Sequence, residues 1–230
     1  MATRLKNESI SMITFVRLII PLLLIAMHNP QLSADEIKTP RVVLVHGFMK
    51  GGTIFKVLQK KLEANGIECM VARMEPSDGR GGLEYLATLL SQQIDAKFGE
   101  KKPFQIISYS MGGLISRYYL QELGKASRCR QFITIATPHH GTQTAYFYPS
   151  LGAQQMRPNS NFLKALAESE TRLGDLPITS YRTPLDLMIL PSNSSIWPRA
   201  DNYAFPVALH PMMVSDRRVV NDIWMKIQER

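Results

Sequence analysis

Two kinds of hydrophobic pattern alternate along the chain from Arg41 onward. Short apolar runs rich in β-branched residues are typical of buried strands, and apolar residues spaced three and four apart are typical of amphipathic helices. The predicted strands cover residues 41–48, 67–74, 104–110 and 131–137, and the predicted helices cover 53–66, 81–99 and 111–124. Continuous apolar strands that alternate with helices indicate an α/β fold, with a mostly parallel sheet covered by helices on both faces.

The regular alternation stops after Thr137. Residues 141–180 contain prolines, aromatic residues and a helical pattern at 161–174, which predicts a short insertion or lid over the carboxyl edge of the sheet. Within it, Tyr146, Phe147 and Tyr148 are expected to form an apolar cover. Further strands are predicted at 184–190 and 202–209, and a closing helix at 214–228. We therefore expect one domain over residues 35–230.

Residues 1–34 have a different pattern. Basic residues precede ten apolar residues at 18–27, a run too short to cross a bilayer, and small residues follow. This order is typical of an export signal, with cleavage expected after Ala34 and an uncleaved anchor through 18–27 or a cytosolic tail as alternatives. The sequence therefore predicts an exported protein, periplasmic or secreted, and N-terminal sequencing of exported material would test the cleavage.

The formal net charge of the chain is +8. Its basic residues are scattered in short pairs, without the zinc-ligand spacing or the basic and aromatic interleaving of nucleic-acid readers. The charge therefore predicts no nucleic-acid partner, but it allows a weak attraction to anionic lipid headgroups at a membrane surface. The sequence gives no indication of oligomeric state.

The two cysteines, Cys69 and Cys129, lie on predicted strands. The expected sheet order separates these strands by roughly three strand spacings, about 14 Å. A disulfide cannot bridge that distance, so we expect two unbridged, buried thiols.

Polar residues gather just after the predicted strands, where open α/β sheets bind ligands. Ser110 ends one apolar strand and opens a helix that begins with Gly112 and Gly113, so a tight turn is expected to raise its hydroxyl above the sheet as a nucleophile. A serine that merely caps a helix is the alternative. Ser108 occupies the position where such a turn prefers glycine, and we interpret its small side chain as structural.

A serine nucleophile needs a general base, which this fold supplies in the order serine, acid, histidine. His139 and His140 precede every acid-bearing strand end that follows Ser110 and are poor candidates, so the segment TPHHGT is interpreted as a loop beside the nucleophile. His210 stands after the last predicted strand and is the only histidine beyond Asp186. We therefore predict His210 as the base.

Three aspartates are candidates for the acid. Asp175 lies in the predicted insertion, Asp186 in the predicted strand 184–190, and Asp201 in the loop after it. An ionisable residue inside an apolar strand is costly unless it has a partner such as an imidazole N–H. This favours Asp186, with Asp201 as the alternative.

The segments VLVHGF, SYSMGGLISRYY, IATPHHGT and DLMILPSNSS, with the late His210, resemble bacterial lipases and related lipid acyl-hydrolases of the α/β-hydrolase superfamily. The resemblance covers residues 41–230 and identifies 35–230 as a catalytic domain. It implies that His210 deprotonates Ser110, that Ser110 attacks an ester carbonyl, and that Asp186 stabilises the imidazolium.

The same resemblance assigns roles to the residues around the nucleophile. It implies an oxyanion hole made by the backbone N–H groups of Phe48 and Met111, with Gly47 allowing close approach and His46 orienting the loop. Ser108 departs from the pattern, because the family usually has glycine or alanine there.

The function predicted from these residues is hydrolysis of carboxylic acyl esters, with lipid esters preferred, through an acyl-enzyme. Neither a metal nor a cofactor is expected. An acyl-thioesterase or amide hydrolase with the same three residues is the alternative, because the catalytic parts are shared. A binding module that has lost catalysis is a further alternative from a different class.

Overall fold

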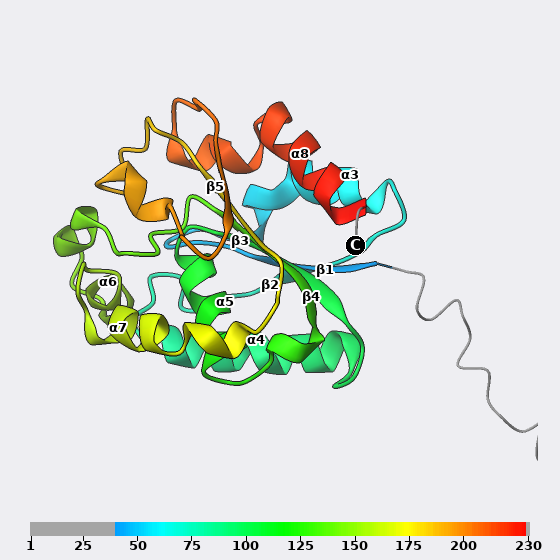
Figure 1. The fold of residues 1–230 in the computed structure, drawn as a ribbon, viewed down its shortest axis with the longest axis horizontal. Helices are drawn as coiled ribbons and strands as arrows, with labels where there is room; N and C mark the ends of the chain where they lie inside the picture. Colours follow the sequence, from blue (N-terminus) through cyan, green and yellow to red (C-terminus); the bar gives the residue numbers. More distant parts are fainter. Residues whose placement is uncertain (1–39, 229–230) are drawn as a thin grey trace, which may run out of the picture. The chain divides into compact units, whose positions relative to one another are not determined.

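The protein is described by a computed structural model over residues 40–228, whose centre is a six-stranded sheet in the order β2-β1-β3-β4-β5-β6 (Figure 1). Every neighbouring pair of strands is parallel. The strands are β1 (Arg41–Val45), β2 (Glu68–Ala72), β3 (Phe104–Tyr109), β4 (Cys129–Ile135), β5 (Ile178–Arg182) and β6 (Asp201–Ala204). The predicted α/β fold with a parallel sheet is confirmed.

Helices cover both faces of this sheet (Figure 1). Along β1, Val43 and Val45 pack in the hydrophobic core of one face, and Val42 and Leu44 in the core of the other, because successive side chains of a strand point to opposite sides. The first face is covered by α4 (Leu83–Phe98) and α5 (Met111–Gln121), and the second by α3 (Lys56–Glu63) and α8 (Arg217–Gln228). Burial on both faces explains why the strands are continuously apolar.

The region after β4 contains two short helices, α6 (Leu151–Gln155) and α7 (Asn161–Glu168). Each begins after a serine whose hydroxyl accepts a hydrogen bond from a backbone N–H of the first turn, Ser150 in α6 and Ser160 in α7. The single helix predicted at 161–174 is instead α7 followed by a 3₁₀ turn at Glu170–Leu173. Between them, the Ser169 hydroxyl donates to the Ala165 carbonyl, a local bond that competes with helix continuation.

The strand predicted at 184–190 is wrong. The fifth strand lies earlier, at Ile178–Arg182, so it begins inside the predicted insertion of 141–180, and residues 184–190 form turns. Pro184 has no N–H for a strand ladder. The carboxylate of Asp186 also accepts hydrogen bonds from the N–H groups of Met188 and Ile189, which folds the segment back on itself.

The last strand is shorter than the predicted 202–209. β6 ends at Ala204, shortly before Pro206. It lies at the edge of the sheet with exposed residues, so the apolar pattern of residues 205–209 belongs to a loop that approaches the site.

Cys69 on β2 and Cys129 on β4 are separated by β1 and β3 and are both free, which confirms that they do not bridge. Cys129 is buried, whereas Cys69 is only partly buried.

The predicted signal or anchor at 1–34 lies outside the described residues and stays a prediction. Within residues 40–228, no helix combines the length and hydropathy needed to cross a membrane.

Candidate active site

Ser110 lies at the sharp turn between β3 and α5. Its backbone has φ +54° and ψ −126°, a conformation that non-glycine residues rarely adopt. The turn is held by a hydrogen bond of 2.8 Å from the Ser110 N–H to the carbonyl of Ile135 on β4. Such a backbone outlier, maintained by its surroundings, is a feature that gathers at functional sites.

Two glycines after Ser110 allow α5 to start against the sheet. A Cβ on Gly112 would lie 2.3 Å from the carbonyl oxygen of Val45, and one on Gly113 would lie 2.0 Å from the Thr137 hydroxyl oxygen. Both distances are shorter than any real contact. Glycine is therefore required at these positions for the helix to lie this close to β1 and to the end of β4.

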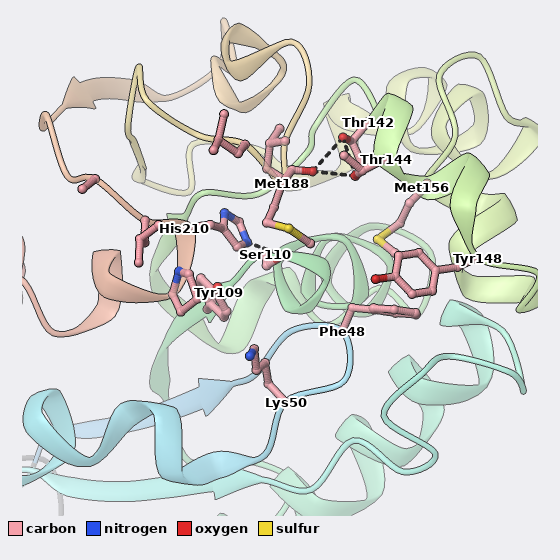
Figure 2. Close-up of a pocket in the computed structure, with 16 residues that line it drawn as sticks. Phe48, Lys50, Tyr109, Ser110, Thr142, Thr144, Tyr148, Met156, Met188 and His210 are labelled. Carbon is pink, nitrogen blue, oxygen red and sulfur yellow. Dashed lines mark hydrogen bonds between the residues drawn. The ribbon is translucent and has the colours of Figure 1, made fainter.

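The structure brings Ser110, His210 and Asp186 together (Figure 2 shows the first two). Nε2 of His210 is 3.0 Å from Oγ of Ser110, and Nδ1 of His210 is 2.7 Å from Oδ2 of Asp186. All three side chains are buried. Since the carboxylate can only accept, Nδ1 carries the hydrogen and Nε2 is left to accept the hydrogen of the serine hydroxyl.

Asp186 reaches His210 from a turn and not from a strand. Its second oxygen, Oδ1, accepts hydrogen bonds of 2.8 and 2.9 Å from the N–H groups of Met188 and Ile189, which orients the carboxylate. The alternative acids lie elsewhere: Asp201 is exposed at the start of β6, and Asp175 is exposed before β5.

The loop after β1 passes directly beside Ser110. A Cβ on Gly47 would lie 2.8 Å from the Cβ of Ser110, so only glycine allows this approach. The N–H groups of Phe48, in this loop, and of Met111, the first residue of α5, make no backbone hydrogen bond within residues 40–228. The first N–H groups of a helix lack intrahelical partners and attract negative charge.

His46 ties this loop to the end of β2. Its Nε2 accepts a hydrogen bond of 3.1 Å from the N–H of Met74, and its Nδ1 lies 3.1 Å from the carbonyl oxygen of Gly47. Burial lowers the pKa of His46, so the ring is neutral at physiological pH. His46 therefore orients the loop, and its ring forms no hydrogen bond with the Ser110 hydroxyl.

Ser108 lies within β3, between Val45 of β1 and Thr134 of β4. Its hydroxyl oxygen is 2.6 Å from that of Ser116 on α5, and both side chains are fully buried. The hydroxyl therefore joins the strand to the helix that follows Ser110, in a place where glycine would leave Ser116 without this partner.

Replacing Ser108 by alanine is expected to lower the free energy of unfolding by about 1–3 kcal/mol, because the buried Ser116 hydroxyl loses its partner. Urea denaturation measures this change. The double variant with Ser116→Ala is the control and should recover part of the loss, since no hydroxyl is then left unpaired. An unchanged free energy of unfolding in the single variant would contradict this role of the pair.

Neither His139 nor His140 bonds to the Ser110 hydroxyl or lines the cavity beside it. His139 is buried, its Nε2 is 3.2 Å from the Thr134 hydroxyl, and its ring stacks on Trp197 at 4.5 Å; this burial lowers its pKa well below the ordinary value. His140 is exposed, with Nε2 3.0 Å from the Ile196 carbonyl oxygen. Both histidines attach the loop near 196 to the end of β4.

A cavity of about 410 Å³ opens beside Ser110 and His210 (Figure 2). We call it the first cavity; its walls are mainly apolar and include Phe48, Tyr109, Ala145, Tyr148, Met156, Leu187, Met188, Ile189 and Leu209. The hydroxyls of Thr142 and Thr144 both donate to the Met188 carbonyl, at 2.9 and 2.6 Å. The cavity beside the Ser110 hydroxyl therefore suits a mostly apolar ligand.

Of the aromatic residues expected as a cover, Tyr148 lines the first cavity. Tyr146 and Phe147 do not, and they are exposed. Sequence reasoning missed Tyr109, whose ring lies 4.9 Å from the His210 ring. No sequence pattern indicates this contact, because it joins residues about one hundred positions apart.

Within the part of the chain that is described, no group of three or more His, Cys, Asp or Glu side chains is arranged to hold a metal ion.

The chain resembles known proteins in sequence and in fold. The family model described as palmitoyl protein thioesterase matches residues 41–174. Among solved structures, the mature form of the lipase BlEst2 from Bacillus licheniformis has a TM-score of 0.66 at 15% identity, over 82% of this chain and 91% of that chain. Est1E from Butyrivibrio proteoclasticus has a TM-score of 0.59 at 14% identity, over 84% and 90%.

A third similar structure is the phospholipase PlaB from Legionella pneumophila, with a TM-score of 0.54 at 17% identity, over 63% of this chain and 39% of that chain. No curated protein sequence matches the chain. At these identities the structural likeness shows the fold alone, which is the α/β-hydrolase fold.

Proposed function

The chain belongs to the palmitoyl protein thioesterase family, and from this premise we propose that it hydrolyses carboxylic acyl esters or thioesters through Ser110, His210 and Asp186. The observation that carries the proposal is the continuous line of hydrogen bonds from Asp186 through His210 to Ser110, at the mouth of an apolar cavity. Acyl groups with an apolar chain match both parts of this site.

The proposed reaction begins when Nε2 of His210 removes the proton from Ser110 as the hydroxyl oxygen attacks the acyl carbonyl. Asp186 holds the imidazole and stabilises its positive charge. The tetrahedral oxyanion accepts hydrogen bonds from the N–H groups of Phe48 and Met111, which bond to no backbone carbonyl within residues 40–228. His210 then protonates the leaving group, and water activated by His210 releases the acid from Ser110.

Lipid acyl groups are the proposed preference. The walls of the first cavity are largely apolar, and each methylene that leaves water contributes about 0.8 kcal/mol to binding. A short soluble ester would leave most of this surface unused.

Both oxygen and thiol esters remain within the proposal, since the thioesterase family match favours the second and the lipase-like fold accommodates the first. Matched pairs of esters and thioesters with acyl chains from acetyl to palmitoyl would rank the two classes by kcat/KM. Mass spectrometry of the quenched reaction should find the acyl group on the peptide that contains Ser110. A panel without turnover and without acylated Ser110 would sink the proposal.

Contact with a lipid surface is part of the proposed function. Leu187 and Leu209 line the first cavity yet are 70% and 54% exposed, and Met49 and Phe147, next in sequence to lining residues, are 60% and 84% exposed. Exposed apolar side chains around a site mouth suit insertion into a bilayer surface, and the net charge of +8 favours anionic headgroups. Co-sedimentation with anionic and neutral phospholipid vesicles tests this; recovery in the supernatant with both would refute it.

A further inference from the structure

The first cavity ends at a pair of aromatic side chains. The rings of Phe48 and Tyr148 meet edge to face, with centroids 4.9 Å apart and planes at 67°. Figure 2 shows both rings, with Met156, at the end of the cavity away from His210. An acyl chain attached to Ser110 and directed to this end of the cavity reaches Tyr148.

A second cavity, also of about 410 Å³, borders the same two rings. Its walls comprise Phe48, Met49, Asp78, Arg80, Tyr148, Pro149 and Ser150. Because Phe48 and Tyr148 line both cavities and touch each other, this aromatic pair forms the wall between them. Opening the wall would double the volume that is continuous with Ser110.

The chemistry of the second cavity suits the end of an apolar chain better than an anion. Its one cation, the Arg80 guanidinium, is already paired with the Asp78 carboxylate, with Nη2 2.8 Å from Oδ2. Met49, Pro149 and the two aromatic rings supply apolar surface.

Tyr148 is held in place through its backbone. Nη2 of Arg157 donates to the Tyr148 carbonyl at 3.3 Å, and Nε of Arg157 donates to the Ala145 carbonyl at 3.4 Å. These bonds hold the backbone at the end of the 3₁₀ turn Gln143–Phe147, which Tyr148 directly follows.

We propose that Tyr148, packed against Phe48, sets the longest acyl chain that the site accepts by closing the first cavity from the second. This inference rests on the proposed function. Tyr148 is a specificity residue and takes no part in bond making. In the wild type, kcat/KM rises with chain length until the chain reaches the pair and then falls.

The test compares Tyr148→Ala and Tyr148→Trp with the wild type, using p-nitrophenyl esters from acetyl to palmitoyl. Alanine opens the wall, so the peak of kcat/KM should move to longer chains, with about a fourfold gain for each added methylene that becomes buried. Tryptophan enlarges the wall, so the peak should move to shorter chains. Tyr85→Ala is the matched control, because Tyr85 is an exposed tyrosine of α4 that lines neither cavity.

A second readout separates this inference from the proposed function. Calorimetry on the Ser110→Ala background measures the affinity for fatty acids from butyrate to palmitate, with and without the Tyr148 substitutions, and needs no turnover. A shift in the preferred length in this assay supports the wall even if the ester panel shows no hydrolysis. The same preferred length with tyrosine, alanine and tryptophan at position 148, by binding and by turnover, would overturn it.

Discussion

Replacing Ser110 by alanine should lower kcat for acyl esters by about 10⁴- to 10⁶-fold, because the variant has no atom with which to form the acyl-enzyme. The side chain is small and lies at a turn held by the backbone, so the fold should be retained. Steady-state kinetics on the acyl chain that the wild type prefers, with circular dichroism as a check of folding, measures the effect.

Ser108→Ala is the matched control for Ser110→Ala. Ser108 lies two residues away, but its hydroxyl bonds to that of Ser116. At temperatures below the thermal unfolding midpoint of this variant, Ser108→Ala should therefore keep most of the wild-type turnover. Activity that survives Ser110→Ala unchanged would refute the nucleophile assignment. Equal losses in the two variants would point to folding instead of chemistry.

Replacing Asp186 by asparagine should lower kcat by about 10⁴-fold, because the His210 ring would then carry its hydrogen on the wrong nitrogen. The amide oxygen of asparagine can keep the hydrogen bonds that Oδ1 accepts from Met188 and Ile189, which turns the NH₂ group toward Nδ1 of His210. Nδ1 must then accept, so the hydrogen moves to Nε2, which can no longer take the proton from Ser110.

Asp201→Asn is the control for Asp186→Asn and should leave kcat and KM close to the wild-type values, because Asp201 is exposed at the start of β6. The same kinetic assay compares the two. A large loss in Asp201→Asn with a mild loss in Asp186→Asn would exclude Asp186 as the acid.

The turn at Ser110 and the parallel sheet were predictable because their causes are local. Apolar runs with helical patterns between them specify buried parallel strands, and the glycines after Ser110 specify a helix that starts against the sheet. The choice of Asp186 over Asp201 agrees with the contact to His210, but the predicted strand 184–190 around it was wrong. The pattern of apolar residues predicted a strand there, although Pro184 and the Asp186 carboxylate favour a turn.

Sequence alone determined the first four strands with the helices between them, the residue types available for acyl transfer and the turn that presents Ser110. Only the tertiary structure decided which carboxylate meets His210 and how Phe48 and Tyr148, one hundred positions apart, meet between two cavities. The physical reason is range. The local sequence specifies hydrogen bonds and steric limits between residues that are a few positions apart. Cavities and long-range contacts form only when separate segments pack together.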